Sequence, residues 1–395
     1  MIQALNSNNI FTEHDESLSL GLKVDPLGFQ LIWTYFGQKN FKDKINSATF
    51  DIRNFNLNLF NHAVIFHMQK EDANIDVNKM IILLENILIW SWYNNQNTFK
   101  KEGLSGTSLT AKKWEDTTKI NLQEDLIKNQ ISSGVNGRYK GAFIQMGFFK
   151  NEYLYDEPKM EEVTKLIEKN KEFKKLFEEM ITWVKTKKID ELPIESYKNV
   201  FKNTNVLVKT TRDFWLKNLG FTKGDAETLY DKIKIGNDQN LKDIFEESYK
   251  VDESENFKNI LRVEPMLAYI NIFFNYLLSR DGSSIKDINS KYIETIKDFD
   301  FSQFGFPSQE ESSVQYRLEK LNDIKDIKTL VAYHTELMID RDRLPWIEIK
   351  DEKLKVLKIQ REGDYEEALN NPNDVMWEHD YYTGVARRVK KGLAV

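Results

Sequence analysis

The segment Val77–Tyr93, VNKMIILLENILIWSWY, is the most strongly apolar part of the chain. From Met80 onward its polar residues are Glu85, Asn86 and Ser91. A helix with this sequence is apolar on nearly every face, which is typical of a helix surrounded by other helices or by lipid. A membrane span needs ~20 mostly apolar residues, and this run is shorter and interrupted. We therefore expect a central helix in a large helical core, and no membrane span.

The composition supports such a core and excludes several kinds of chemistry. The chain has 395 residues, 41% of them hydrophobic and 12% aromatic, with only 7 prolines and 17 glycines. This length and apolar content suit two or three globular domains, and the scarcity of proline and glycine favours helices over turn-rich β folds. The absence of cysteine excludes disulfide bonds, thiolate zinc sites and a cysteine nucleophile. Together with an N-terminus that lacks the pattern of a signal peptide, it points to the cytoplasm.

Periodic apolar residues predict a mainly α-helical, multi-helix globular fold. The expected helices cover 25–45, 49–69, 77–93, 122–131, 142–149, 159–187, 196–201, 206–219, 225–235, 241–249, 265–279, 285–299, 314–338 and 374–393. One minor β-hairpin is expected near 346–358, because WIEI and KLKVLK alternate on either side of a short polar turn. The polar stretch 94–118 predicts a surface loop. We place an N-terminal helical domain at 1–156, a middle helical segment at 157–255 and a C-terminal helical domain with the hairpin at 256–395.

The segment Ser132–Gly141, SSGVNGRYKG, combines glycines with basic and aromatic side chains. Glycines let backbone amides approach a phosphate, arginine and lysine supply positive charge, and tyrosine stacks on bases. The spacing fits neither the Walker A pattern nor GxGxxG, and a tight turn leading into a helix explains the glycines equally well. The candidate residues for binding nucleic acid or another anion are Gly134, Gly137, Arg138, Tyr139 and Lys140.

A second polar cluster, within Tyr333–Lys350, brings together His334, Asp340, Arg341, Asp342 and Arg343. A histidine with carboxylates is able to do acid–base work or bind a metal. The chain has only five histidines and neither an HxxxH nor an HExxH pair, so no metal site is expected. Pairing of the arginines with the acids at a helix end is the structural alternative.

Glu348 and Lys350, separated by one residue on the expected first strand, suggest a further chemistry. In metal-dependent nucleases a glutamate at this spacing binds Mg²⁺ and the lysine steadies the attacking water or the phosphate. Such a site also needs an aspartate on a neighbouring strand, whereas Asp340 and Asp342 precede the strand closely at a helix end. The same spacing arises by chance in a chain rich in lysine and glutamate.

The expected C-terminal helix carries the basic residues Arg387, Arg388, Lys390 and Lys391. Positive charge at a helix C-terminus interacts favourably with the helix macrodipole, which explains the cluster without a ligand. The cluster also suits a nucleic-acid backbone or an acidic partner protein. With a net charge of −6, the whole molecule is not a general polyanion binder, so such binding requires a local basic patch.

The sequence lacks the nucleophile elbow, dinucleotide, kinase and P-loop signatures, and this favours a protein without enzymatic activity of its own. We expect no cofactor. The leading hypothesis is a non-catalytic helical subunit of a larger intracellular complex with other protein subunits. The bias toward lysine, asparagine and isoleucine suggests a bacterium, and a DNA-handling or antiviral defence system as the setting. The alternatives are a direct DNA- or RNA-binding protein that uses the loop 132–141 and the C-terminal basic helix, and the nuclease with Glu348 and Lys350.

Overall fold

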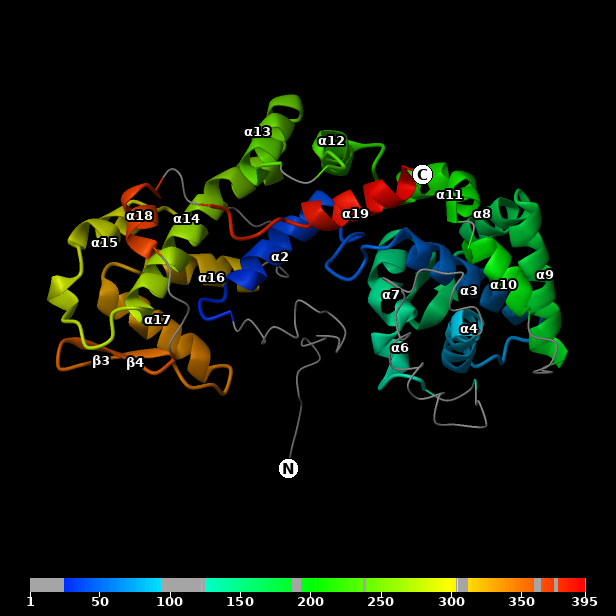
Figure 1. Ribbon diagram of the computed structural model, residues 1–395, viewed down its shortest axis with the longest axis horizontal. Coiled ribbons are helices and arrows are strands. Elements are labelled where there is room, and N and C mark those ends of the chain that lie inside the picture. Colours follow the sequence, from blue (N-terminus) through cyan, green and yellow to red (C-terminus); the bar gives the residue numbers. More distant parts are fainter. Residues whose placement is uncertain are drawn as a thin grey trace. The chain divides into compact units, whose positions relative to one another are not determined.

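The computed structural model describes residues 25–93, 122, 125–186, 193–202, 204–236, 239–302, 304, 312–358, 364–372 and 376–394. Over these residues the chain is mainly helical, with two small antiparallel strand pairs (Figure 1). This confirms the predicted fold class. None of the described helices is long and apolar enough to cross a bilayer. The expected loop 94–118 lies outside the described residues.

The chain folds into two compact units, and each unit is assembled from segments that are distant in the sequence. The first unit comprises Phe41–Ile235 and Tyr382–Val395, and the second comprises Lys23–Asn40 and Gly236–Tyr381. The domain boundary that we placed at 156 falls inside the first unit, and the one at 255 falls inside the second.

The first unit is built from helices around one small strand pair. Its elements are α3 (Ile52–Glu71), α4 (Val77–Tyr93), α6 (Gln130–Ser133), α7 (Val135–Gln145), β1 (Phe149–Lys150), η1 (Asn151–Tyr153), β2 (Leu154–Tyr155), α8 (Glu157–Glu168), α9 (Lys171–Thr186), α10 (Ile194–Lys202), α11 (Thr204–Leu219), α12 (Gly224–Lys232) and α19 (Thr383–Leu393). α4 has the predicted bounds. The predicted helix 159–187 is two helices, because the Asn170 side chain accepts from the N–H groups of Glu172 and Phe173 and starts a new helix there.

The centre of the first unit is α3 rather than α4. α3 packs against α4, α7, α8, α9, α11 and α19, and its buried residues lie on all of its faces. Four of them are asparagines: Asn54, Asn56, Asn58 and Asn61. Polar residues recur along the sequence of α3, which is a pattern typical of a helix at the surface. The more apolar α4 packs against α3, α6 and α10.

The second unit packs helices around α14 (Glu255–Leu278). Its other elements are α2 (Phe29–Asn40), α13 (Leu241–Val251), η3 (Ile285–Asp287), α15 (Ser290–Lys297), α16 (Ser312–Asn322), α17 (Ile327–Ile339), β3 (Ile347–Lys350), β4 (Lys353–Val356) and α18 (Tyr365–Asn370). The prediction that the α14 helix starts at Pro265 was wrong, because Ser254 caps it and Pro265 lies inside it. The predicted helix 314–338 divides into α16 and α17, since Asp326 and Thr329 form a capping box at a new helix start.

Glu264 of α14 joins three parts of the second unit. One carboxylate oxygen accepts from the Trp33 indole N–H at 2.6 Å and the Tyr381 hydroxyl at 2.7 Å. The other accepts from the backbone N–H groups of Glu378 and His379. Burial raises the pKa of Glu264 to about 7, although all four donors favour the ionised form. Residues 378–381 are thus held by α14 and are not helical, which corrects the predicted start of the C-terminal helix at 374 to Thr383.

Candidate functional site

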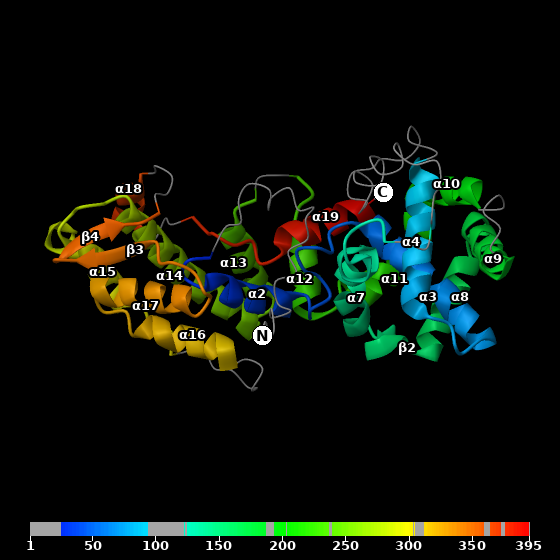
Figure 2. The ribbon, with the colours of Figure 1, turned by 90° about the horizontal axis from the view of Figure 1, so that it is seen from below.

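A groove of about 640 Å³ lies on the second unit between α17 and the β3–β4 hairpin. Both views place α17 beside this hairpin (Figures 1 and 2), and α17 packs against β3. The residues that line the groove are Lys328, Val331, Ala332, Thr335, Glu336, Glu348, Ile349, Asp351 and Glu352. The groove is shallow and open to solvent, unlike the enclosed clefts that bury most of a small ligand.

The buried residue His334 fixes the position of α17 relative to the start of β3. Its Nε2 accepts a hydrogen bond from the backbone N–H of Trp346 at 2.8 Å, and its Nδ1 donates to the carbonyl of Pro26, also at 2.8 Å. A ring that accepts at one nitrogen and donates at the other is neutral. Burial lowers the pKa of His334, which also favours the neutral form. His334 is therefore occupied by backbone partners and is not available as a base.

The arginine and acid residues near His334 contact the chain at the end of α17. The Arg341 guanidinium donates to the backbone carbonyl of Asp25 at 2.6 Å and lies 3.8 Å from its carboxylate. Asp342 has a positive φ of 54°, which belongs to the turn between α17 and β3. The contacts of Arg341 favour the structural alternative for this residue. Asp340, Asp342 and Arg343 are exposed.

The groove is acidic. Four carboxylates line it, from Glu336, Glu348, Asp351 and Glu352, against the single ammonium of Lys328. Three of the four carboxylates have a lysine partner: Glu352 pairs with Lys328 at 2.6 Å, Glu348 lies 3.6 Å from Lys355, and Glu336 lies 3.9 Å from Lys320. Exposed ion pairs such as these contribute ~0–1 kcal/mol and exchange readily with other partners. A cationic ligand is therefore able to compete for these carboxylates.

Large apolar side chains are exposed at the end of the same helix. Ile339, the last residue of α17, is 62% exposed, and Leu344 in the following turn is 84% exposed. Ile339 follows Ala332 and Thr335 at helical spacing, so it extends the face of α17 that lines the groove. These two side chains add apolar surface at the end of the groove.

Glu348 and Lys350, the candidate nuclease residues, lie on β3 as predicted. Glu348 faces Lys355 of β4, and Lys350 is exposed next to the turn. Within the described part of the chain, no three histidine, cysteine, aspartate or glutamate side chains are close enough to hold a metal ion. The nuclease hypothesis is therefore supported by the Glu348–Lys350 spacing alone.

The predicted glycine-rich loop at 132–141 is helical, which corrects that expectation. It contains the end of α6 and the first residues of α7, with Gly134 between the two helices. A Cβ atom at Gly134 would lie 2.3 Å from the Glu85 carboxylate, and one at Gly137 would lie 2.1 Å from the carbonyl oxygen of Ser132. Glycine is required at both positions, because the Glu85 side chain lies close to Gly134 and the backbone of α6 lies close to Gly137.

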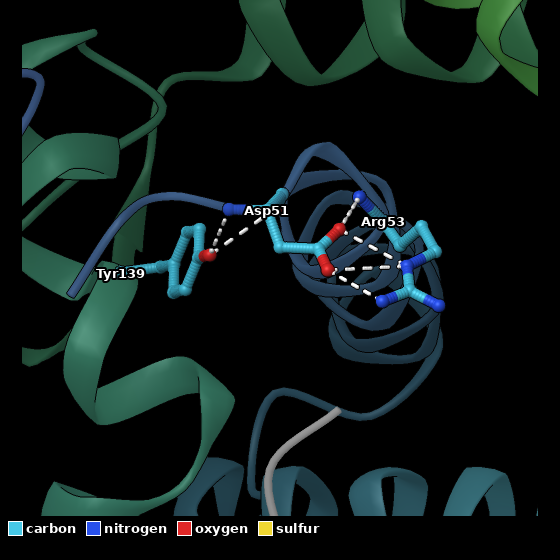
Figure 3. Close-up of polar contacts among 3 residues, drawn as sticks. All are labelled: Asp51, Arg53 and Tyr139. Atoms are coloured by element: carbon cyan, nitrogen blue, oxygen red, sulfur yellow. Dashed lines mark hydrogen bonds and ion pairs between the residues drawn. The ribbon is translucent and has the colours of Figure 1, made fainter. Parts of the chain in front are cut away.

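The side chain of Tyr139 is fully buried, and its hydroxyl lies against the start of α3 (Figure 3). It accepts from the backbone N–H of Asp51 and donates to the carbonyl of the same residue, both at 3.2 Å. Asp51 is the N-cap of α3, and its carboxylate also pairs with the guanidinium of Arg53 at 2.6 Å. In this conformation Tyr139 holds α7 against α3 and presents no ring face on which a base could stack.

The basic residues of the same segment are placed beside protein groups. Arg138 donates from Nε to the carbonyl of Ser133 at 3.1 Å, and the Lys140 ammonium lies 4.4 Å from the centre of the Tyr153 ring. Both side chains are partly buried. Nucleic-acid binding by Arg138 and Lys140 remains a prediction.

The basic residues of α19 have different surroundings. Lys390 donates to the carbonyl of Tyr230 and lies over its ring, and Arg388 lies 5.3 Å from the centre of the Phe50 ring. Arg387 is partly buried, and Lys391 is exposed. Lys390 and Lys391 occupy the last turn of the helix, where positive charge is favourable.

A lysine cluster that the sequence did not reveal lies elsewhere on the first unit. Lys44 is partly buried, and its pKa is lowered by burial and by the nearby ammonium groups of Lys159, Lys223 and Lys42. Its Nζ lies close to Gly220, and a Cβ atom added to this glycine would be 3.7 Å from the Lys44 Nζ. The four lysines come from three separate parts of the sequence, 42–44, 159 and 223, so only the fold brings these parts together. We call these residues the Lys44 cluster.

A buried hydrogen-bond network also crosses the core of the first unit. Asn136 donates from its backbone to Glu85 at 2.7 Å, and its side-chain oxygen accepts from His62 at 2.9 Å. His62 also bonds the Tyr155 hydroxyl at 2.7 Å, and Gln130 bonds Glu85 and Asn86. The sequence signal for this network is the polar pair Glu85 and Asn86 inside the apolar α4.

Two titratable groups in this network are shifted in opposite directions. Burial raises the pKa of Glu85 to about 7 and lowers the pKa of His62 to about 3. The cavity beside Glu85, Gln130 and Gly134 has a volume of about 10 Å³, far below that of a substrate site. The network therefore belongs to the packed core and does not form a catalytic pocket.

Comparison of the chain with protein-family models, with curated proteins and with solved structures found no match.

Proposed function

We propose that this chain is a non-catalytic subunit that binds another protein, and that the groove between α17 and β3 is the binding site. The observation that carries the proposal is the groove itself: about 640 Å³, acidic, and extended by the exposed side chain of Ile339. The proposal includes the setting predicted from the sequence, a bacterial DNA-handling or antiviral assembly in the cytoplasm. Compositional bias alone supports that setting.

The distribution of reactive groups supports binding rather than catalysis. Glu85, His62 and Glu264 have strongly shifted pKa values, yet each lies in the packed core and is hydrogen-bonded there. The groove instead holds exposed carboxylates and apolar side chains. Shifted pKa values mark a catalytic site only where the groups also face a space that admits a substrate.

Site-specific crosslinking in native cells tests the proposal. A photoreactive amino acid replaces Ala332, an exposed residue of the groove, and the matched control places it at Lys291, an exposed residue of α15. We expect a discrete crosslinked partner from position 332 and none from position 291. A partner that crosslinks equally from both positions, or none from either, would contradict the proposal.

Direct nucleic-acid binding is the second candidate function, and the Lys44 cluster is the observation that favours it. Burial lowers the pKa of Lys44, and the ammonium groups of Lys159, Lys223 and Lys42 lower it further. Phosphate contacts release counterions, so binding of this kind weakens steeply with salt. The Lys44 cluster is a further candidate location for a basic patch, besides the predicted segment 132–141 and the basic residues of α19, Arg387, Arg388, Lys390 and Lys391.

Light scattering after size-exclusion chromatography, with short duplex and single-stranded DNA at low salt, separates the Lys44 cluster from the segment 132–141. Lys44→Ala with Lys223→Ala is compared with Arg138→Ala plus Lys140→Ala. Loss of the complex in the first variant assigns binding to the Lys44 cluster, and loss in the second assigns it to the predicted segment. If the unmodified protein forms no complex with either DNA, this candidate function is wrong.

A further inference from the structure

The segment 25–28, which we call the strap, is held through consecutive backbone carbonyls by α17 and the turn after it. The side-chain donors are Tyr333, His334 and Arg341, which bond the carbonyls of Leu27, Pro26 and Asp25, in that order, at 2.7, 2.8 and 2.6 Å. The strap leads into α2, where the N–H groups of Phe29 and Gln30 donate to the Asp25 carboxylate. The start of α2 is thus fixed on α17.

His334 connects the strap to the β3–β4 hairpin as well. Its Nδ1 bonds the Pro26 carbonyl, and its Nε2 accepts from the N–H of Trp346, the residue before β3. Both partners have a fixed role, because a carbonyl only accepts and a backbone N–H only donates. The two bonds together require a neutral imidazole with its proton on Nδ1. A proton on Nε2 would set two donors against each other, and the N–H of the buried Trp346 would lose its acceptor.

The surroundings of the imidazole provide no free partner for a second proton. α14 presents the ring of Phe274, whose centre lies 4.7 Å from that of His334, and the hairpin side presents the ring of Trp346 at 6.2 Å. The titratable and charged side chains of the strap, α16, α17, the turn after it and the hairpin that lie in this region are Asp25, Arg317, Tyr333, Arg341 and Lys358. Three of them are cations, and the one carboxylate lies 3.8 Å from the guanidinium of Arg341. An imidazolium at this position is therefore unfavourable.

We propose that His334 makes the groove sensitive to acid, because protonation of its Nε2 releases the start of β3 and the strap from α17. This inference rests on the proposed function and names a regulation of the same site. The groove is lined by residues of α17 together with Glu348 and Ile349 of β3. A partner that contacts both elements needs them in their closed arrangement, so its affinity falls when His334 is protonated.

The direction of the pH effect follows from the burial of His334. Burial lowers its pKa below the ordinary value of 6.5, and the released imidazole regains that value. The bonds of the neutral ring are therefore fully favoured above pH 6.5, and they weaken as the pH falls below it. Because one proton is bound, the open arrangement gains at most about tenfold per pH unit.

Hydrogen exchange measured by mass spectrometry on the full chain tests this release without a partner. The peptides of interest cover the strap and residues 340–347. His334→Gln is the matched variant, because glutamine keeps a donor and an acceptor and does not titrate. Both proteins are compared at the same pH, so the intrinsic pH dependence of exchange cancels. Between pH 7 and pH 5 we expect these peptides to gain roughly tenfold in exchange rate relative to the variant. The same pH response in both proteins would overturn the inference.

A second variant, Tyr333→Phe, removes one bond to the strap and keeps the imidazole. We expect faster exchange in the strap at both pH values, with the acid response of residues 340–347 retained. Loss of that response in Tyr333→Phe would contradict the role of His334. If His334→Gln fails to fold, α13 of the same unit is the reference within the unmodified protein, and an equal acid response of α13 and residues 340–347 would overturn the inference.

Crosslinking from position 332 in cell lysate at pH 7 and pH 5 relates the release to the proposed function. A crosslink that weakens in acid in the unmodified protein, but not in His334→Gln, supports regulation of the groove. A partner that crosslinks equally at both pH values leaves the proposed function intact and overturns this inference. An acid response in hydrogen exchange without any crosslinked partner supports the release of β3 by His334 and contradicts the proposed function.

Discussion

At the scale of residues, the distance from a glycine to the neighbouring backbone decides whether the first unit tolerates a larger side chain at that position. Gly137 and Gly141 both lie in α7, yet their surroundings differ. A Cβ atom at Gly137 would meet the backbone of Ser132, whereas one at Gly141 would meet nothing within 4 Å. The sequence presents the two as equivalent members of a glycine-rich segment, and only the packing of α6 against α7 distinguishes them.

This difference predicts opposite effects of alanine on stability. Gly137→Ala should lower the free energy of unfolding by ~1–3 kcal/mol, because the α6 backbone must shift to admit the methyl group. Gly141→Ala should raise it by ~0.5–1 kcal/mol, since alanine loses less conformational entropy in a helix than glycine. Urea denaturation of both variants measures the two changes. Destabilisation of equal size in both variants would show that the close approach at Gly137 does not govern the effect.

The buried imidazole of His62 predicts a pH dependence. Its folded-state pKa of about 3 lies below the ordinary value of 6.5, so the stability it contributes is present above pH 6.5 and is lost as the pH falls toward 3. Glu85 acts in the opposite sense, because its pKa is raised to about 7 and its contribution is lost as the pH rises from 4.5 through 7.

Comparison with His62→Gln isolates the histidine. The difference in unfolding free energy between the unmodified protein and the variant should shrink by up to ~1.4 kcal/mol per pH unit below pH 6.5. Urea denaturation at pH 7, 5.5 and 4 provides the measurement, and Glu85 is present in both proteins. A difference that stays constant across this range would mean that His62 is not buried in its neutral form.

At the scale of elements, helix caps determine where α17 begins and therefore where the groove lies. Asp326 and Thr329 form the capping box at the start of α17. Asp326→Ala should lower the free energy of unfolding by ~1 kcal/mol, because an N–H of the first turn loses its acceptor. Asp323→Ala is the matched control at an exposed site before the cap, and should change stability by less than ~0.5 kcal/mol. Thermal denaturation that gives the two variants equal midpoints would contradict the role of the cap.

The same caps explain how much of the fold could be predicted. Apolar periodicity located α4 and most other helices, and alternation located the β3–β4 hairpin. Periodicity failed where two helices follow each other with an apolar side in common, at Asn170 and at Asp326, because the capping side chain was the only local sign of the break. Glu336 and Glu348 of the groove were visible in the sequence, but their meeting in one groove depends on the packing of α17 against β3.

At the scale of the whole molecule, the sequence did not predict which distant segments of the chain pack together. The first unit takes its last helix from Tyr382–Val395, and the second takes its first from Lys23–Asn40. α19 packs with α3 and α11, which precede it by more than 160 residues in the sequence. A division into consecutive domains was therefore the natural prediction, and the Lys44 cluster, which joins residues 42, 44, 159 and 223, could not be foreseen.

The discontinuous first unit makes a prediction for a chain shortened to end at Tyr381. α19 packs on α3, α11 and α12, and buries Ala386, Val389 and Leu393. Because burial of a Val or Leu side chain contributes ~1.5–3 kcal/mol, loss of Val389 and Leu393 with α19 should destabilise the first unit by about two such contributions. Hydrogen exchange measured by mass spectrometry should then show faster exchange in α3 and α11, with α14 of the second unit unchanged. Lys391→Ala, an exposed change on the same helix, should leave all three helices protected, and faster exchange in α14 on removal of α19 would contradict the division into two units.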